Sequence, residues 1–397
     1  MEPILSAVSS NANQLYTLLR CIGFAPKASV QITPDGIRFS VEEGRVMQGL
    51  AFLDKALFST YTFNAPTETS NAHDESDEEG VTYPHFLISL SALLETLQIF
   101  GINDTSASNS SAAPQLNPSS SNAFTTPALL LNRSCTIQYS HVGAPLSITL
   151  SEAGIKTTCE LTTYEPDDPS FGSSAGELDI PLQRDAIIMK IIMRSTWLHN
   201  AITELDSTNP TVLTLSASAK REPFFALSGS GGPFSESTVE FSIEKDSEGS
   251  GVSALSQTNH KVISEDGSSS SRSRAAKKAK LAPTVTETFL VSPPSSMVSR
   301  VKQNYRFALI RKASRAMAVA NKVSIRGDRQ GVLSLQFMIE LGDNNAGGGG
   351  GGNTGGVQPP GGGLGGNISF VDFRFVPLVD EEEARDDEEG ELGSEEE

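Results

Sequence analysis

Apolar and polar side chains alternate along most of this chain, which is the pattern of half-buried β-strands. In the first half, this alternation predicts strands at residues 29–33, 37–42, 46–53, 57–63, 86–90, 129–131, 136–140, 146–150 and 155–162. In the second half, it predicts strands at 212–216, 224–227, 238–243, 323–326, 332–339 and 368–376. The tripeptide Pro34-Asp35-Gly36 separates the first two strands, as expected for a hairpin. We therefore expect a protein built mainly of sheets.

Four segments instead carry apolar residues at the helical spacing i, i+3, i+4, i+7. They lie at residues 15–22, 90–97, 198–205 and 313–320, and Ser195 is expected to cap the third. Each half of the chain thus has the order helix, strands, helix, strands, which indicates an internal duplication. Helices with one apolar stripe cover one face of a sheet, and head-to-tail pairing in a closed ring protects the exposed sheet edges.

Five segments are too poor in apolar residues to fold against a core, and we expect them to be disordered. They are residues 68–80, 103–123, 244–283, 341–366 and 380–397, which are rich in acids, Ser, Asn or Gly. The remaining residues suffice for two domains. We expect a first domain at 1–163 with the insertions 68–80 and 103–123, a connector at 164–178, a second domain at 179–379 with the insertions 244–283 and 341–366, and an acidic tail at 380–397.

The negative charge of the chain is unevenly placed. The 397 residues carry a formal net charge of −18, of which the tail at 380–397 contributes −11. Such tails more often solubilise a protein than form a site, and this one does not exclude a basic surface elsewhere.

The sequence favours a reducing compartment. The three cysteines Cys21, Cys135 and Cys159 are widely spaced and odd in number, so no disulfide framework is expected. No apolar stretch is long enough to span a membrane, and the first residues lack the pattern of a secretory signal.

Catalytic chemistry has little support in the sequence. The five histidines show no metal-ligand spacing with the cysteines, and the glycine run at 347–352 lacks the GK[ST] ending of a phosphate loop. A two-metal nuclease needs clustered carboxylates, whereas the densest acids lie in predicted loops at 74–79, 167–168 and 380–397. We expect no catalytic residue, no metal and no cofactor.

Four segments carry a family resemblance. They are NYRFALIRKASRAMAVANKVSIRGDRQGVLSLQFMIE at 304–340, GIRFSVEEGRVMQGLAFLDKALF at 36–58, LSALLETLQIFG at 90–101 and TELDSTNPTVLTLS at 203–216. Together they resemble the Rad-one type subunit of the nine-one-one DNA-damage checkpoint clamp, a relative of the PCNA sliding clamp. The resemblance covers most of the chain outside the five insertions, and these low-complexity insertions suggest a fungal source.

The resemblance implies an α+β, PCNA-like sliding clamp of two similar domains, with outer antiparallel sheets and two helices in each domain facing the interior of a ring. It implies a non-catalytic subunit of a heterotrimeric checkpoint clamp in the nucleus. Such a clamp encircles double-stranded DNA without sequence preference and is loaded at damaged DNA to recruit partners and activate the checkpoint and repair. Its partners would be two other clamp subunits and a clamp loader, with no membrane. Two alternatives stay open, a 3'-5' DNA exonuclease of the same family and a homotrimeric replication clamp.

Three groups of residues are candidates for contacts. Cations near the predicted helices would face DNA phosphates, because a sliding clamp needs only sequence-independent attraction. These cations are Arg20, Lys190, Arg194, Arg311, Lys312, Arg315 and Lys322. By analogy with PCNA-like clamps, edge strands would meet the neighbouring subunits through Ile155, Thr157, Cys159, Thr238, Val239, Phe241 and Ile243. A basic cluster in the Ser-rich insertion resembles a nuclear localisation signal and consists of Arg272, Arg274, Lys277, Lys278 and Lys280.

Each group also has a plainer explanation. The cations can be ordinary solvated charges, the strand edges can be covered by the protein's own insertions, and the basic cluster can be an arm that touches DNA nonspecifically. The connector at 164–178 can border a partner-peptide groove, as in PCNA-like clamps, or be a plain linker.

Overall fold

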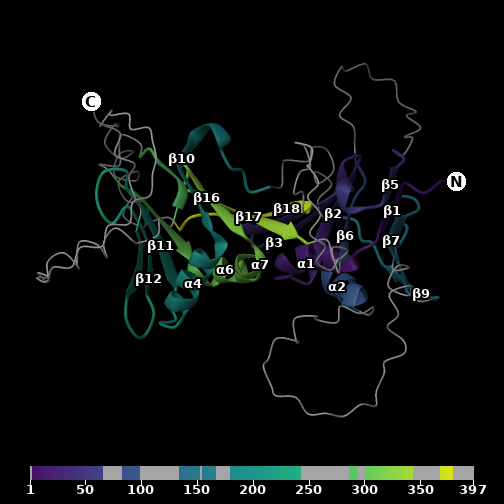
Figure 1. Cartoon of the computed structure of the whole chain (residues 1–397), viewed down its shortest axis with the longest axis horizontal. Coiled ribbons are helices and arrows are strands. Elements are labelled where there is room, and N and C mark those ends of the chain that lie inside the picture. Colours follow the sequence, from purple (N-terminus) through teal and green to yellow (C-terminus); the bar gives the residue numbers. More distant parts are fainter. Residues whose placement is uncertain are drawn as a thin grey trace, which may run out of the picture.

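The computed structural model describes residues 2–65, 83–98, 134–152, 154–166, 179–242, 286–293, 300–342 and 367–378. Within these residues, antiparallel strands form three sheets, and the helices lie in a row along one side of them (Figure 1). The predicted strand at 129–131, the basic cluster and almost all of the five insertions lie outside the described residues.

The two halves of the chain have the same order of elements. The first half contains β1 (Leu5–Ser9), α1 (Ala12–Cys21), β2 (Lys27–Thr33), β3 (Gly36–Glu43), β4 (Met47–Asp54), β5 (Thr60–Phe63), β6 (His85–Ser89), α2 (Leu90–Gln98), β7 (Ser134–Tyr139), β8 (Leu146–Glu152) and β9 (Ile155–Leu161). The second half contains β10 (Ile187–Arg194), α4 (Ser195–Asp206), β11 (Val212–Ala217), β12 (Phe225–Ser230), β13 (Ser237–Phe241), β14 (Thr286–Val291), β15 (Val301–Arg306), α6 (Phe307–Lys312), α7 (Ser314–Val319), β16 (Lys322–Asp328), β17 (Leu333–Leu341) and β18 (Asn367–Phe375). This repeat agrees with the predicted internal duplication.

One sheet joins the two halves. Its nine strands have the order β14-β10-β16-β17-β18-β4-β3-β2-β6, and β18 of the second half pairs with β4 of the first. The first half adds a five-stranded sheet, β5-β1-β7-β8-β9, and the second half adds a four-stranded sheet, β13-β12-β11-β15. Figure 1 shows β9 at one end of the molecule and β12, the partner of β13, at the other.

The helices cover one face of the sheets because each has a single apolar stripe. α1 buries Leu15, Leu18 and Leu19, and α4 buries Leu198 and Leu205. These stripes join the inward-facing strand residues in one continuous core. None of the helices in the described part of the chain is both long and apolar enough to cross a membrane.

Three local details differ from the sequence prediction. The predicted helix at 313–320 is α7, and the short helix α6 before it was not predicted; the two are separated at Ala313, whose N–H bonds to the carbonyl three residues back and tightens the turn. Ser195 is the first residue of α4 and not its cap, because its hydroxyl donates to the Met317 carbonyl at 2.8 Å. The predicted strand at 57–63 begins in a 3-10 turn, η1 (Lys55–Leu57), and only Thr60–Phe63 pairs as a strand, β5.

The sequence prediction missed four strands, β1, β10, β14 and β15. β10, IIMKIIMR, is an almost continuous apolar run with a register shift between Ile187 and Met189, so it lacks clean alternation. β15, VKQNYR, resembles a polar loop in sequence, although its Gln303 is buried and hydrogen-bonded to the Asp328 carbonyl and the Tyr305 hydroxyl. A strand whose buried side chains are polar and hydrogen-bonded therefore cannot be recognised from apolar periodicity.

Candidate functional site

The helices form one layer that crosses the boundary between the two halves. α1 contacts α2 in the first half and α7 in the second, and α7 in turn contacts α4. This layer runs along one side of the strands (Figure 1). The sequence places most of the candidate DNA-facing cations near these helices, so their surroundings decide what the layer can bind.

Two of the predicted cations lie close to each other where the halves meet. Arg20 of α1 is exposed, with its guanidinium 5.7 Å from the centre of the Tyr16 ring. Arg315 of α7 is exposed and donates to the Gly23 carbonyl at 3.3 Å. Burial raises the pKa of the nearby Cys21 thiol to about 12, and the charges of both arginines oppose that rise. Neither arginine has a carboxylate partner among the described residues, so both charges are available to an external anion.

Arg311 and Lys312 lie in the same layer but are partly neutralised. Arg311 of α6 pairs with Asp206 at 3.1 Å, and both side chains are exposed. Lys312 pairs with Glu43 of β3 and lies 5.9 Å from the centre of the Phe24 ring. Lys312 therefore ties α6 to the first half, whereas Arg311 remains accessible to solvent.

The other three predicted cations lie elsewhere. Lys190 of β10 and Lys322 of β16 are on the sheet face opposite the helices, because side chains alternate along a strand and neighbours such as Ile191 point into the core. Lys322 is also ion-paired with Glu287 at 2.9 Å. Arg194 is exposed at the start of α4, beside Lys322 in the strand register. Lys190 and Lys322 therefore do not belong to the helix layer, which corrects that part of the prediction.

The predicted subunit contacts lie on two edge strands. Within the described residues, β9 pairs only with β8, and β13 pairs only with β12. On β9, Ile155 is 62% exposed, and Thr157 and Cys159 are half-buried. On β13, Thr238 is exposed and Val239 is half-buried. Both strands thus offer an unpaired backbone edge, together with side chains that a neighbour can reach.

Two of the predicted contact residues need a different description. Phe241 of β13 is 7% exposed, and its ring stacks on Phe225 of the next strand with centres 4.9 Å apart. Its side chain therefore belongs to the core of its own half, because the rings pack against each other inside the sheet. Ile243 lies outside the described residues.

Sequence reasoning missed a cluster of charges where the connector ends. The Asp179 carboxylate accepts hydrogen bonds from Arg38 of β3 and, at 2.8 Å, from Gln48 of β4, and it lies 3.7 Å from Arg374 of β18. The next peptide is held as well, because the Ile180 N–H donates to Gln48 at 3.1 Å and its carbonyl accepts from Arg374 at 2.8 Å. These partners come from both halves, so the cluster fastens the connector to their boundary.

A second carboxylate, Asp372 of β18, extends this cluster. Burial raises the pKa of Asp372, while the hydroxyl of Ser334 at 2.8 Å and the guanidinium of Arg374 at 3.2 Å oppose the rise. Asp179 and Asp372 are therefore engaged by arginines. Among the residues that the structure describes, no group of three or more His, Cys, Asp or Glu could hold a metal ion.

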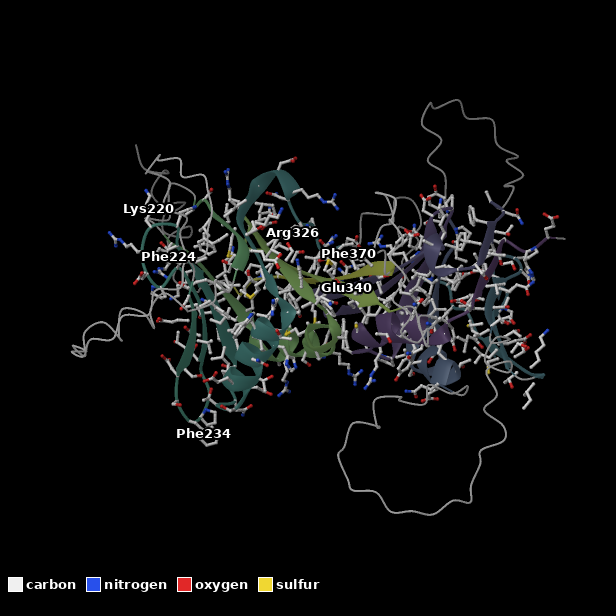
Figure 2. All side chains as sticks on the ribbon, viewed as in Figure 1. Lys220, Phe224, Phe234, Arg326, Glu340 and Phe370 are labelled. Atoms are coloured by element: carbon white, nitrogen blue, oxygen red, sulfur yellow. The ribbon has the colours of Figure 1, made fainter. Side chains whose placement is uncertain are left out.

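The outer face of the nine-stranded sheet also exposes apolar side chains. Phe370 and Ile368 of β18 are 49% and 53% exposed, and Phe52 of the adjacent β4 is 37% exposed. Figure 2 shows Phe370 near Glu340, with Arg326 further toward the second half of the molecule. The outer face of β18 and β4 thus combines exposed apolar side chains at one end of β18 with the charged side chains of Asp372 and Arg374 at the other.

A comparison with solved structures and one with family models define the class of protein. The structure resembles PCNA from Thermococcus kodakaraensis with a TM-score of 0.53 and 13% identity, and the match covers 94% of this chain and 100% of that protein. The fold is therefore that of a PCNA-like sliding clamp, which confirms the prediction. The family model for the repair protein Rad1/Rec1/Rad17 matches residues 4–339. The chain belongs to the Rad1/Rec1/Rad17 family of repair proteins.

Relatives with checkpoint names align over most of the chain. The DNA damage checkpoint control protein rad1 of Schizosaccharomyces pombe is 29% identical over 369 residues, which are 92% of this chain and 84% of the relative. The cell cycle checkpoint protein RAD1 of Homo sapiens is 28% identical over 339 residues, 85% of this chain and 87% of the relative. The DNA repair exonuclease REC1 of Mycosarcoma maydis is 27% identical over 206 residues, only 51% of this chain and 39% of that protein.

Proposed function

We propose that this chain is a non-catalytic subunit of a DNA-damage checkpoint clamp, in which it and two other subunits encircle double-stranded DNA. The observation that carries this proposal is the presence of edge strands β9 and β13 at opposite ends of a PCNA-like subunit. Head-to-tail pairing of such strands closes a ring and removes both edges. The clamp domains would be residues 1–163 and 179–379, joined by the connector 164–178 and followed by the tail 380–397.

The helix layer would face the DNA. Arg20 and Arg315 are exposed on this layer with neutral partners, and Arg311 is exposed beside Asp206. Contacts between such cations and phosphates are independent of base sequence and let a protein move along a duplex. A checkpoint clamp needs this kind of contact, because DNA damage occurs at any sequence.

The ring would contain two different partner subunits. The relatives are named for the DNA damage checkpoint and the cell cycle checkpoint, which favours a checkpoint clamp over a homotrimeric replication clamp. In this proposal a clamp loader opens the ring at damaged DNA, and the loaded ring recruits partners that activate the checkpoint and repair. The chain would act in the nucleus, with the basic cluster within residues 272–280 as its import signal.

A 3'-5' exonuclease is the second candidate function, because one relative is named as a DNA repair exonuclease. Metal-dependent cleavage needs clustered carboxylates, and Asp179 and Asp372 are each engaged by arginines. We therefore favour the non-catalytic role. Incubation of the purified chain with a 3'-labelled duplex and Mg²⁺ or Mn²⁺ tests the alternative. Cleavage that follows the chain through purification would establish it.

Mass measurements in solution test the clamp itself. We expect the full chain to be monomeric alone and to form a 1:1:1 complex with its two partner subunits. The assembled ring should stay on a closed DNA circle and slide off after the circle is cut. A stable homotrimer of the chain alone would favour the replication clamp, and no association with either subunit would contradict the ring.

A further inference from the structure

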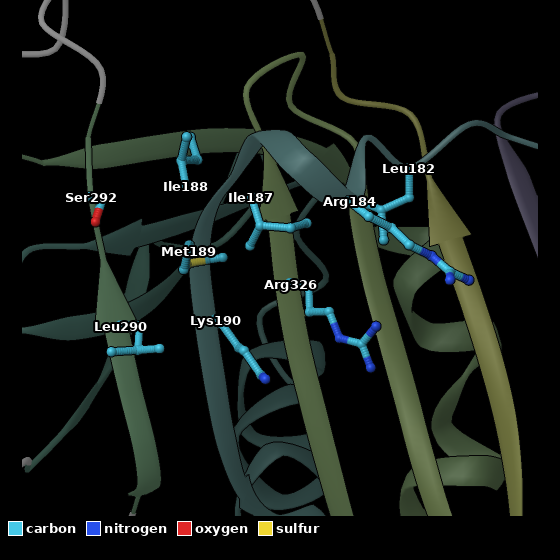
Figure 3. Close-up of a pocket in the computed structure, with 9 residues that line it drawn as sticks. All are labelled: Leu182, Arg184, Ile187, Ile188, Met189, Lys190, Leu290, Ser292 and Arg326. Carbon is cyan, nitrogen blue, oxygen red and sulfur yellow. The ribbon is translucent and has the colours of Figure 1, made fainter.

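A pocket opens on the outer face of the second half, away from the helix layer (Figure 3). Its volume of about 480 Å³ is sufficient for one or two side chains of a bound peptide. Residues of β10, β14 and β16 form its floor, and Leu182 and Arg184, which follow the connector, form part of its rim. The pocket therefore combines three strands with the end of the connector.

Two cations face each other on one side of the pocket. Lys190 of β10 and Arg326 of β16 are directly opposite in the strand register, an arrangement of like charges that destabilises a sheet. Arg326 is held by neutral groups, the Ser324 hydroxyl at 3.1 Å and the Gln336 side-chain oxygen. In the described part of the chain, no carboxylate forms an ion pair with either cation.

The nearby carboxylate Asp372 does not supply the missing negative charge. The charge of Arg326 opposes the rise in the pKa of Asp372, but the Asp372 carboxylate is ion-paired with Arg374 at 3.2 Å and accepts a hydrogen bond from Ser334. Arg184 adds a third cation at the rim and is exposed. The pocket thus has an excess of positive charge, which a bound anionic group would compensate.

The opposite side of the pocket is apolar. Leu290 of β14 is the other strand neighbour of Lys190 and is 60% exposed, and Ile187 of β10 extends this wall. Figure 3 shows Leu290 on one side of Lys190 and Arg326 on the other. Adjacent strands lie about 5 Å apart, and an extended peptide repeats its side chains on one face every ~7 Å. The apolar wall and the cation pair are therefore spaced for side chains i and i+2 of an extended segment.

We infer that this pocket binds an extended segment of a partner protein that carries a bulky apolar side chain and, two residues along, a carboxylate or a phosphate. The apolar side chain lies on Leu290 and Ile187, and the anionic group lies between Lys190 and Arg326. A peptide supplies both parts of this chemistry, whereas a nucleic acid backbone supplies only the anion.

Peptide binding here is separate from ring closure and from the proposed DNA contacts. The pocket is on the sheet face opposite the helices, and it contains no residue of β9 or β13. The test can therefore use the full chain without DNA, and its failure would leave the clamp proposal unaffected.

Fluorescence anisotropy of short labelled peptides tests the inference. The peptides share a Gly-Ser background around Leu-Ser-X, where X is Glu, phosphoserine, Gln or Lys. We expect the full chain to bind the Glu or the phosphoserine peptide, the Gln peptide about tenfold more weakly, and the Lys peptide not at all. The stronger of the first two identifies the anion as a carboxylate or a phosphate.

Two variants place the binding in the pocket. Lys190→Glu should weaken binding of the anionic peptides about tenfold and improve binding of the Lys peptide. Leu290→Ser should weaken all of the peptides, because it removes the exposed apolar contact. Neither side chain has a described polar partner, and unchanged thermal melting would show that the fold is intact.

Matched controls lie on other parts of the surface. Lys220→Glu reverses an exposed cation far from Arg326 (Figure 2), and Phe370→Ser removes an exposed apolar side chain of the same sheet. Neither control should change binding. No binding of any anionic peptide up to about 1 mM would overturn the inference. Loss of binding in Phe370→Ser but not in Leu290→Ser would overturn it as well, because the occupied surface would then be β18.

Discussion

The helix-covered face of the nine-stranded sheet and its outer face at the domain boundary use arginine in opposite ways. On the helix-covered face, Arg20 and Arg315 are exposed and contact neutral groups. On the outer face at the domain boundary, Arg38 and Arg374 are mostly buried and share the Asp179 carboxylate. Removing a charge from water is costly, so a buried arginine requires a carboxylate and then serves the structure. An exposed arginine with neutral partners keeps its charge for an external phosphate. The surroundings of a charge, and not the residue type, separate the two roles.

Removing the charges of the helix layer should have the largest effect. In the assembled ring, the triple change Arg20→Gln, Arg311→Gln and Arg315→Gln should weaken binding to a linear duplex roughly 100-fold to 1,000-fold at ~0.1 M salt. The slope of log K against log salt should fall by about 3, because three phosphate contacts are lost. Titrations of a labelled duplex at several salt concentrations measure both quantities.

The control for this prediction is the other face of the same sheet. Lys190→Gln removes one positive charge from the outer pocket and should leave the affinity for DNA and the salt slope unchanged. If Lys190→Gln lowered the salt slope as much as a single change on the helices, both faces of the sheet would contact DNA. The proposal that only the helix layer faces the DNA would then be wrong.

Loss of the carboxylate at the domain boundary should have the next largest effect. Asp179→Ala leaves Arg38 and Arg374 mostly buried without this partner, so the free energy of unfolding should fall by about 3 kcal/mol. Urea unfolding followed by circular dichroism measures the change. The matched control is Asp35→Ala, because Asp35 pairs with Lys55 at 2.8 Å on the exposed surface. That change should have no measurable effect, and equal losses in both variants would contradict the role assigned to burial.

Most of the fold could be predicted from the sequence because local periodicity reflects burial. The stripe of α1 and the alternation of β2, β3 and β4 follow directly from which residues enter the core. β15 could not be predicted this way, because its buried Gln303 is polar. The Asp328 carbonyl, which is distant in the sequence, and the Tyr305 hydroxyl stabilise this side chain, and both hydrogen bonds form only on folding. Apolar pattern reports burial only where the buried residue is apolar.

The sites were less predictable, because they depend on contacts between distant residues. Asp179 and Arg38 are separated by 141 positions, and Arg374 lies 194 positions from the Ile180 carbonyl that it binds. No local spacing indicates such a cluster. The position of Lys190 could have been corrected from the sequence, since recognising β10 as a strand places Lys190 opposite its apolar neighbours.

Cysteine labelling tests the edge strand β9, which belongs to the five-stranded sheet and not to the sheet whose two faces are compared above. Burial raises the pKa of Cys21 and of Cys135 to about 12, so both remain thiols at mildly alkaline pH, although the charges of Arg20 and Arg315 reduce the rise at Cys21. Cys159 of β9 is only half-buried. We expect a maleimide to modify Cys159 first in the isolated chain, and the assembled ring to slow this reaction several-fold. Peptide mass spectrometry measures the sites and rates, and unchanged labelling on assembly would exclude β9 from the subunit contact.

The pH dependence at Asp372 should be the smallest effect. It tests whether the ionised carboxylate of Asp372 on the outer face destabilises the folded protein. Burial raises the pKa of Asp372 in the folded protein, despite the opposing contacts with Ser334 and Arg374. The folded state then binds this proton more tightly than the unfolded state does. The resulting stabilisation is fully present below the unfolded-state pKa and is lost as the pH rises through the folded-state pKa.

Asp372→Asn has no such proton, so the wild-type chain should gain stability relative to this variant as the pH falls from about 7 to about 4. Urea unfolding across that range measures the difference. A relative loss for the wild-type chain on acidification would mean that the ion pair with Arg374 outweighs burial at Asp372.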